Sequence, residues 1–194
     1  MRRRSSITRR RRPELVEEKT LSSRVLFQGR AVKLRLDTVL TGEGRRTTRE
    51  VVEHADCIAV VAVDAGDNVL LVNQFRQAVG KSLLEIPAGG IDDGEDAATA
   101  VIRETREETG LRPGKVVRLG GFYSAPGYAT EYLYLYLATD LVPDPLSAED
   151  TAGIEVVKVP LAQITDLVAS GKIEDSKSIA GLLAYLEYRR TRRV

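Results

Sequence analysis

Three glutamates, Glu104, Glu107 and Glu108, follow one another at a spacing that would bring their carboxylates together on a helix. At about 100° per residue, side chains three and four positions apart lie on the same flank. Carboxylates this close repel one another, so the cluster is costly unless a cation lies among them. Oxygen ligands without nearby histidine or cysteine favour Mg²⁺ or Mn²⁺ over zinc. The glutamates therefore predict a hard divalent metal site; the alternative is a solvated acidic helix face.

The helix that would carry these glutamates is predicted over residues 97–109, which contain neither proline nor glycine. Mostly apolar residues recur there at three- and four-residue steps, which is typical of one stripe facing a core. The stripe consists of Ala98, Val101, Ile102, Thr105 and Thr109. The glutamates lie along one flank of it.

Seven residues of the surrounding segment match a known motif. Gly89, Glu95, Arg103, Glu104, Glu107, Glu108 and Gly110 resemble the Nudix box, G-x5-E-x7-R-E-U-x-E-E-x-G-U, in which U is a bulky apolar residue. Leu111 conforms at the second U position, whereas Thr105 departs at the first. A threonine there can return its hydroxyl to the preceding turn. We therefore expect some local loss of stability at Thr105 and no loss of chemistry.

Length and composition favour one domain. The chain has 194 residues, of which 43% are hydrophobic, enough for one well-filled core and few for two. Neither an apolar run near the length of a membrane span nor a signal-peptide core follows the basic start, so we expect no membrane contact and a cytoplasmic location.

The single cysteine, Cys57, indicates a small buried hydrophobe rather than a nucleophile. His54 is the only histidine, which disfavours a Ser-His-Asp triad and a histidine-rich zinc site.

Positive charge is concentrated at the two ends of the chain. Seven arginines occur in the first twelve residues and four in the last six, although the formal net charge is only +1. Residues 1–13 could bind nucleic acid as an electrostatic arm. A disordered terminus is the commoner explanation for such a segment. We therefore expect no nucleic-acid partner, and expect removal of residues 1–12 to leave turnover almost unchanged.

The remaining segments alternate between strand-like and helical patterns. Apolar periodicity predicts strands over 23–29, 31–40, 116–124, 132–140 and 154–160, and a central hairpin from 57–64 and 69–76. We expect a turn at Gly29-Arg30, the end of the box at Pro113-Gly114, and loops at Pro87 with the glycines after it, over 125–131 and over 142–153. Helices are predicted over 161–171 and 176–190, the latter with an apolar face formed by Ile179, Leu182, Leu183 and Leu186. This order of elements is typical of an α+β architecture.

The box and the order of elements resemble the Nudix hydrolase superfamily. The resemblance implies a Nudix fold, an α/β/α sandwich around a mixed sheet, here with an N-terminal antiparallel β extension. It divides the chain into a basic tail (1–13), a β extension (14–54) and a Nudix hydrolase domain (55–194). It also implies Mg²⁺-dependent hydrolysis of a nucleoside diphosphate linked to another group, with Mn²⁺ as a substitute. A homodimer, in which the N-terminal strands cross to the partner, is implied as well.

Segments outside the box resemble the ADP-ribose pyrophosphatase branch: QFR at 74–76, LLEIPAGGID at 83–92, SAPGYATE at 124–131 and the tail GKIEDSKSIAGLLAY. Pro126 matches the proline that follows the box in that branch. The implied products are AMP and ribose 5-phosphate. One alternative is another nucleotide sugar as substrate, such as ADP-glucose, UDP-glucose or GDP-mannose. The other is a module that senses ADP-ribose without cutting it, which has little need of the complete set of box carboxylates.

The resemblance also assigns roles to single residues. The carbonyl of Ala88, Glu104 and Glu108 would hold the metal, Glu107 would add a carboxylate, and Arg103 would pair with Glu95 or Glu107. Arg76 would meet substrate phosphates, because its planar donors suit phosphate oxygens; the alternative is a surface arginine at a strand end. Glu85 would orient the metal site or a ribose, and Glu131 would contact the terminal ribose or cap a strand. Phe75, Tyr123 and Tyr128 could stack on adenine, although core packing is the favoured interpretation of each.

A catalytic base is the last component that the resemblance implies. A pyrophosphate resists hydroxide because its own oxygens are anionic, so a catalyst must neutralise charge and align a water. In this branch the base comes from the loop after the strand over 132–140. Glu149 and Asp150 are the candidates there, yet Thr151 and the residues after it interrupt the acidic run. Glu107 is the fallback base.

Overall fold

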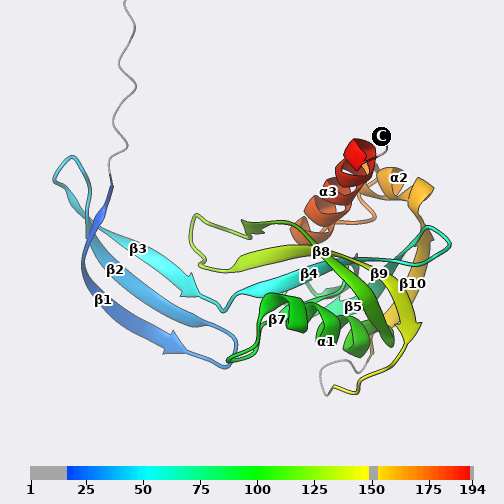
Figure 1. The fold of residues 1–194 in the computed structure, drawn as a ribbon. Helices are drawn as coiled ribbons and strands as arrows, with labels where there is room; N and C mark the ends of the chain where they lie inside the picture. Colours follow the sequence, from blue (N-terminus) through cyan, green and yellow to red (C-terminus); the bar gives the residue numbers. More distant parts are fainter. Residues whose placement is uncertain (1–16, 149–152, 193–194) are drawn as a thin grey trace, which may run out of the picture.

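The computed structural model describes residues 17–148 and 153–192. Within these residues the chain forms two β-sheets, three α-helices and a short 3-10 helix (Figure 1). The helical elements are α1 (Ala97–Thr109), η2 (Leu161–Gln163), α2 (Ile164–Ala169) and α3 (Ser176–Arg192). None of the described helices combines the length and the apolar character that crossing a bilayer requires.

A seven-stranded mixed sheet forms the centre of the molecule. Its strands are β4 (Cys57–Val63), β5 (Asn68–Arg76), β6 (Lys81–Glu85), β7 (Ala88–Gly90), β8 (Leu111–Tyr123), β9 (Tyr132–Pro143) and β10 (Glu155–Pro160). The order is β10-β5-β4-β9-β8, with β6 paired to β5 and β7 to β4. Strands β4 and β9 run parallel, whereas the other pairs are antiparallel. The predicted mixed sheet is therefore confirmed.

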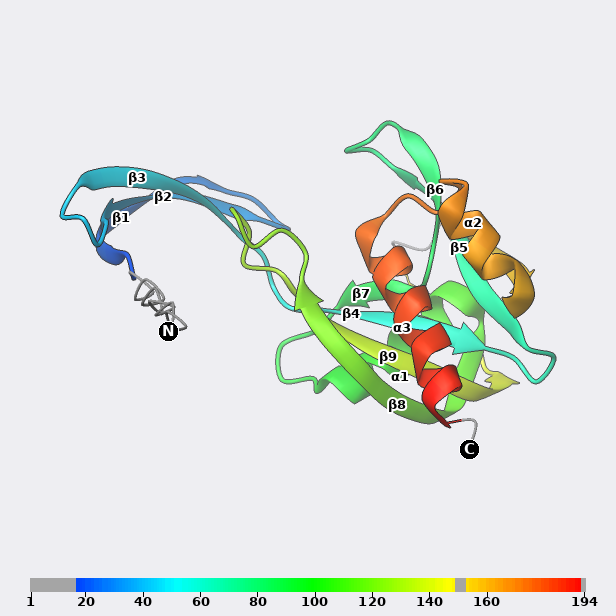
Figure 2. The same cartoon turned by 90° about the horizontal axis from the view of Figure 1, so that it is seen from above.

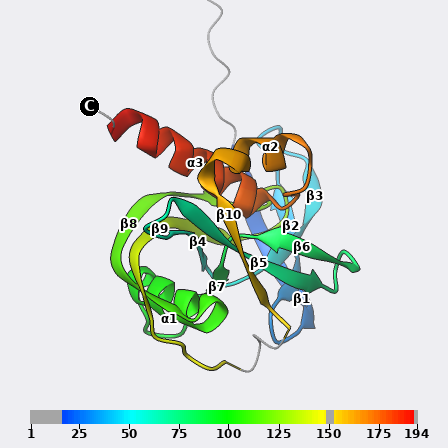
Figure 3. The ribbon, with the colours of Figure 1, turned by 90° about the vertical axis from the view of Figure 1, so that its right-hand side faces the viewer.

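Strand β4 explains the layered core, because all seven of its residues are buried. Alternate side chains of a strand point to opposite faces, and a strand covered on both faces is apolar throughout. Ala59 and Val61 pack in one cluster with Leu182 of α3, whereas Ile58 and Val60 pack in another with residues of α1. Helices α1 and α3 accordingly cover opposite faces of the sheet (Figure 3). This is the expected α/β/α sandwich.

Helix α1 has the predicted bounds, but its buried face is rotated from the predicted stripe. Ala98 is exposed, and burial runs instead through Ala100, Val101, Thr105 and Glu108. A polar residue, Glu108, thus lies on the face that faces the sheet, which apolar periodicity alone cannot indicate. The predicted local bond of Thr105 is present, since its hydroxyl donates to the Val101 carbonyl at 2.6 Å.

Helix α3 differs in the same way from its predicted apolar face. Leu183 is 46% exposed, whereas Gly181, Leu182 and Tyr185 are buried. At Gly181 the helix packs so tightly that an added Cβ would lie 2.8 Å from Cδ1 of Ile86 and 3.0 Å from Cδ1 of Leu135 in β9. Leu183 follows Leu182 by about 100° of helical rotation, so it points away from that contact.

Three further expectations from the sequence are wrong. Strand β8 begins at Leu111 and includes Pro113-Gly114, where the sequence places the end of the box before a strand over 116–124; a proline is tolerated there because β8 is an edge strand. The loop predicted at Pro87 and the glycines after it contains strand β7, whose pairing with the distant β4 the sequence does not indicate. Phe75, Tyr123 and Tyr128 are each more than half exposed instead of packed in the core.

An N-terminal antiparallel sheet stands apart from the sandwich (Figures 1 and 2). It consists of β1 (Lys19–Gln28), β2 (Lys33–Leu40) and β3 (Arg46–Glu53). The predicted turn after Gln28 closes with a bond of 2.9 Å from the Gly29 amide to the Val32 carbonyl. Every residue of β1 is exposed, including Val25, Leu26 and Phe27. Much apolar surface is therefore uncovered on this sheet.

Candidate active site

The box carboxylates line a cavity of about 440 Å³ between α1, β7 and the end of β5. Helix α1 is fixed at its start by Asp96, whose side chain accepts from the amides of Ala98 and Thr99. It ends at Gly110, which adopts a left-handed φ of 74°. The lining residues are Gln74, Arg76, Ala88, Gly89, Gly90, Asp92, Arg103, Glu104, Glu107, Glu108 and Ala148.

Glycine at position 89 allows α1 to approach β7 closely. A Cβ on Gly89 would lie 2.0 Å from Cδ and from Oε1 of Glu104, a distance at which no side chain fits. At Gly90, by contrast, an added Cβ would meet nothing within 4 Å. The carboxylate of Glu104 therefore lies directly against the backbone that precedes the helix.

Arg103 connects the loop to the helix through five hydrogen bonds to four residues. Its guanidinium donates to both carboxylate oxygens of Glu95 at 3.1 and 2.8 Å and to the Gly90 carbonyl at 2.8 Å. It also donates to Glu104 at 2.7 Å and to Glu107 at 3.1 Å. These bonds lower the pKa of Glu95 and raise that of Arg103. The arginine thus stays charged and holds the glutamates in place.

Glu108 is a buried carboxylate, with 9% of its surface exposed. Burial, followed by the negative charge of Glu104, raises its pKa to about 8. The amide of Ala88 opposes this shift by donating to Oε2 of Glu108 at 3.1 Å. Burial also raises the pKa of Glu104, although its bond from Arg103 acts in the opposite direction. Two carboxylates therefore share a site in which their own charges are costly.

The oxygen atoms that line this cavity are suitable ligands for a divalent cation. Two carboxylates whose ionised forms are disfavoured by burial and by each other are stabilised when a cation lies between them. All the side-chain donors from α1 are oxygen atoms, the preference of Mg²⁺ and Mn²⁺. The backbone of Ala88 lines the same cavity. Ala88, Glu104, Glu107 and Glu108 could hold such an ion together.

A second charged cluster, around Glu85, lies beside this cavity. Glu85 is almost fully buried and accepts from Arg76 at 3.0 and 2.6 Å and from Lys177 of α3. Although burial acts in the opposite direction, these two cations lower the pKa of Glu85. Lys177 also donates to Asp175 at 2.9 Å. Glu85 therefore fixes the plane of the Arg76 guanidinium, which borders the cavity.

A second cavity, of about 540 Å³, lies next to this one, since Arg76 and residues 88–90 line both. Glu131, His54, Cys57 and Lys177 also line the second cavity. Pro126, Phe75 and Tyr128 line neither cavity. Their predicted contacts with substrate therefore receive no support from this geometry. Glu149 and Asp150, the candidate bases, lie outside the described residues.

The sequence interpretation missed several residues around these cavities. Gln74 precedes Arg76 in QFR, and Lys177 lies in the C-terminal segment already likened to the ADP-ribose pyrophosphatase branch, so both lay inside recognised motifs. The nearness of Cys57 to Glu131 gave no signal, because it depends on the parallel register of β4 and β9.

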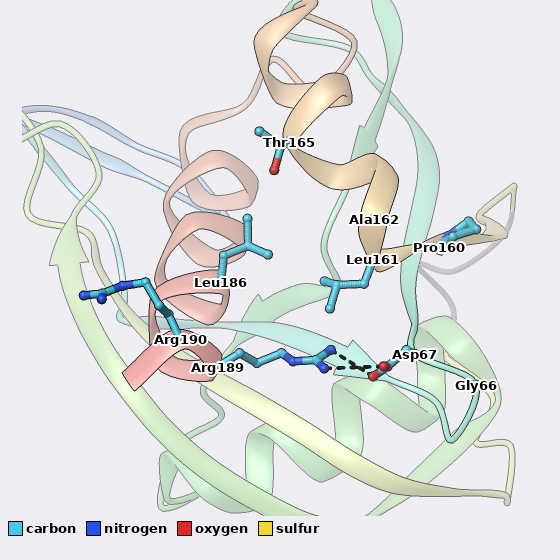
Figure 4. A pocket seen from close by; sticks show the side chains of 9 residues that line it. All are labelled: Gly66, Asp67, Pro160, Leu161, Ala162, Thr165, Leu186, Arg189 and Arg190. Carbon is cyan, nitrogen blue, oxygen red and sulfur yellow. Dashed lines mark hydrogen bonds and ion pairs between the residues drawn. The ribbon is translucent and has the colours of Figure 1, made fainter. Parts of the chain in front are cut away.

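A larger cavity, of about 620 Å³, lies elsewhere, between η2, α2 and α3 (Figure 4). Leu161 and Leu186 border it, and Arg189 pairs with Asp67 across its floor at 2.9 Å. Its lining contains a single carboxylate, and that one is engaged by the arginine. Size alone does not make it the chemical site. The carboxylate-lined cavity has the donors that catalysis requires.

Comparison with known proteins identifies the family of this chain. The family model described as the NUDIX domain matches residues 53–182, which include the whole box. The chain therefore belongs to the Nudix family and is a Nudix hydrolase. A crystal structure of an "ADP compounds hydrolase" superposes with a TM-score of 0.83 at 21% identity, covering 92% of this chain and 97% of that one. This likeness confirms the Nudix fold.

Relatives at higher identity cover most of the chain. ADP-ribose pyrophosphatase of Bacillus subtilis (strain 168) is 32% identical, over 89% of this chain and 94% of that protein. ADP-ribose pyrophosphatase of Mycobacterium tuberculosis (strain ATCC 25618 / H37Rv) is 39% identical, over 85% and 81%. GDP-mannose pyrophosphatase of Enterobacter sp. (strain 638) is 32% identical, over 90% and 94%.

Proposed function

We propose that this protein hydrolyses the pyrophosphate bond of ADP-ribose, giving AMP and ribose 5-phosphate. The observation that carries the proposal is the cluster of Glu104, Glu107 and Glu108 on the wall of a cavity that Arg76 also lines. Anionic ligands for a cation and a cationic donor for phosphate thus border the same space. The two relatives named ADP-ribose pyrophosphatase support the choice of substrate.

The proposed cofactor is Mg²⁺, with Mn²⁺ as a substitute. Glu104, Glu108 and the Ala88 carbonyl would hold it, and Glu107 would add a further carboxylate. When bound, it supplies positive charge that offsets the phosphate oxygens and makes a water more acidic. The depth of Glu108 in the cavity supports this assignment, because its pKa of about 8 leaves it poorly ionised without a cation.

Side chains of this protein would carry out the remaining steps. Arg76, held in plane by Glu85, would bind phosphate oxygens of the diphosphate. Arg103 would keep Glu104 and Glu107 in position. Glu149 or Asp150 would accept the proton of the attacking water, with Glu107 as the fallback. The water oxygen joins one phosphorus, the bridging oxygen leaves with the other, and both products are monophosphates.

The test of substrate is the release of nucleoside monophosphate from four compounds in the presence of Mg²⁺. ADP-ribose should be turned over faster than ADP-glucose, UDP-glucose and GDP-mannose. Equal or better turnover of a hexose nucleotide would reject the proposal in favour of a nucleotide-sugar pyrophosphatase. GDP-mannose is the specific alternative, since a relative of that activity aligns over most of the chain.

The test of the carboxylates is Glu108→Gln, which keeps the shape of the side chain and removes its charge. Turnover should fall by at least about a hundredfold, because a ligand is lost at the reacting centre. The far-ultraviolet circular dichroism spectrum should not change. Near-normal turnover would contradict the metal assignment. Tight binding of ADP-ribose by the unsubstituted protein without any hydrolysis would instead identify a sensing module.

We also propose a homodimer formed through the N-terminal sheet. The apolar residues exposed on β1, among them Val25 and Phe27, support it, because surface of this kind marks interaction sites. A second copy of the chain is the partner that the family resemblance implies.

A further inference from the structure

Three side chains of different chemistry converge on the wall of the second cavity, of about 540 Å³, which lies next to the carboxylate-lined one. His54 follows β3, Cys57 begins β4, and Glu131 directly precedes β9. A nitrogen, a sulfur and a carboxylate oxygen from these residues all lie within 4.8 Å of one another. Nδ1 of His54 is 3.9 Å from Sγ of Cys57 and 3.7 Å from Oε1 of Glu131. The proposed mechanism above gives a role to none of the three.

The backbone around these side chains is fixed by pairing. Cys57 lies opposite Leu133 in the parallel pair of β4 and β9, which places the residue before β9 next to the start of β4. Thr130, which precedes Glu131, connects that segment to His54. Its hydroxyl accepts from the His54 amide at 3.0 Å and donates to the His54 carbonyl at 3.1 Å. The backbone positions of the three candidate ligands are therefore fixed relative to one another.

We propose that His54, Cys57 and Glu131 form a second metal site, selective for a soft or borderline divalent cation such as Zn²⁺, whose occupation obstructs the binding of substrate in the second cavity. Thiolate and imidazole prefer zinc to magnesium, in contrast to the all-oxygen donors on α1. Three protein ligands leave a fourth tetrahedral position open toward the cavity that these residues line. The site would thus hold an ion without any ligand from α1.

The geometry needs only small adjustments. Tetrahedral zinc sets nitrogen–sulfur and nitrogen–oxygen separations of about 3.4 to 3.6 Å, a few tenths of an ångström below the distances present. His54 and Glu131 are half-buried and can move by this amount. Nδ1 of His54 also lies 2.7 Å from the Ala55 carbonyl. Ion uptake has to break that contact, by loss of the Nδ1 proton or by rotation of the ring to present Nε2.

The charge around the thiol also favours a cation. Burial and the charge of Glu131 raise the pKa of Cys57 to about 12, and Glu104 and Asp56 add to the shift. The same negative surroundings that disfavour a bare thiolate stabilise a dication bound to it. Arg76 and Lys177 line the same cavity, but each is engaged by Glu85.

The binding test uses Co²⁺ as a spectroscopic substitute for Zn²⁺ on the full-length reduced protein. A thiolate ligand gives an intense near-ultraviolet charge-transfer band, and Cys57 is the only cysteine in the chain. The band should saturate with one equivalent and disappear when Zn²⁺ is added. Cys57→Ala should remove it, and His54→Ala should weaken binding by at least about tenfold. No band, or a band unaffected by His54→Ala, would overturn the site.

The regulatory part of this inference rests on the proposed function. With Mg²⁺ saturating, Zn²⁺ should raise the apparent KM for ADP-ribose, and a zinc-selective chelator should reverse the effect. Cys57→Ala should turn over normally without Zn²⁺ and be at least about tenfold less sensitive to it. Equal sensitivity of the two proteins would place inhibition at the α1 carboxylates and overturn the proposal. If no nucleotide is hydrolysed, the proposed function fails, whereas the cobalt band still decides the site.

Discussion

Glu108 is buried next to Glu104, where ionisation of its carboxyl group is unfavourable, so the stability of the protein should depend on pH. In the folded protein without metal, its pKa of about 8 keeps it protonated at neutral pH, whereas in the unfolded chain it ionises near 4.5. The native state therefore binds the extra proton between these two values. Stability falls as pH rises through this window, because proton release favours unfolding.

The first prediction compares the wild type with Glu108→Gln in EDTA. Glutamine cannot ionise, so the wild type should lose stability relative to the variant by up to about 1.4 kcal/mol per pH unit between pH 4.5 and 8. Above that pH the difference should level off. Urea denaturation at several pH values measures it. Parallel curves for the two proteins would contradict the burial of a titrating carboxylate, and added Mg²⁺ should favour the wild type alone.

Gly89 provides a second residue-scale prediction, with its neighbour as a matched control. Gly89→Ala would place a methyl group 2.0 Å from the Glu104 carboxylate, so the carboxylate must move. A displacement of about 1 Å in a catalytic group can cost roughly a hundredfold in rate. Gly90→Ala, which meets nothing within 4 Å, should change turnover by less than about threefold. Equal turnover of the two variants would show that Glu104 is not required in its present position.

At the scale of elements, apolar periodicity predicted which segments form helices better than it predicted which faces they bury. On α1 the buried face differs from the predicted stripe in that it includes Glu108, a polar residue. On α3 the buried face includes Gly181, which has no side chain and packs against Leu135 of β9. Periodicity counts apolar side chains, so it cannot detect a face that a glutamate or a glycine occupies.

The third prediction contrasts two adjacent leucines of α3. Leu182→Ala should destabilise the protein by about 2 to 5 kcal/mol, because it opens a cavity beneath a fully buried side chain. Leu183→Ala should cost less than about 1 kcal/mol, since Leu183 is largely exposed. Chemical denaturation measures both. Similar losses for the two variants would restore the face that the sequence alone predicts.

At the scale of the whole molecule, the predictability of the site follows sequence distance. Glu95, Arg103 and Glu104 lie within one continuous motif, so one segment revealed their nearness. Lys177 joins Glu85 from the far end of the chain, and His54 meets Glu131 through the pairing of β4 with β9. Such contacts depend on topology, which propensities and motifs in a single segment do not encode.

The last prediction concerns the N-terminal sheet, which no described element of the sandwich covers along β1. Val25 and Phe27 are 53% and 58% exposed, and burying them in a second chain would remove a large apolar surface from water. Val25→Asp and Phe27→Asp should each place a charge in that interface and convert a dimer to a monomer, measured by size-exclusion chromatography with light scattering. Leu183→Asp, which adds the same charge to an exposed apolar site on α3, should remain dimeric. A monomeric wild type would refute the interface, and a dimer that survives both β1 substitutions would place it elsewhere on the molecule.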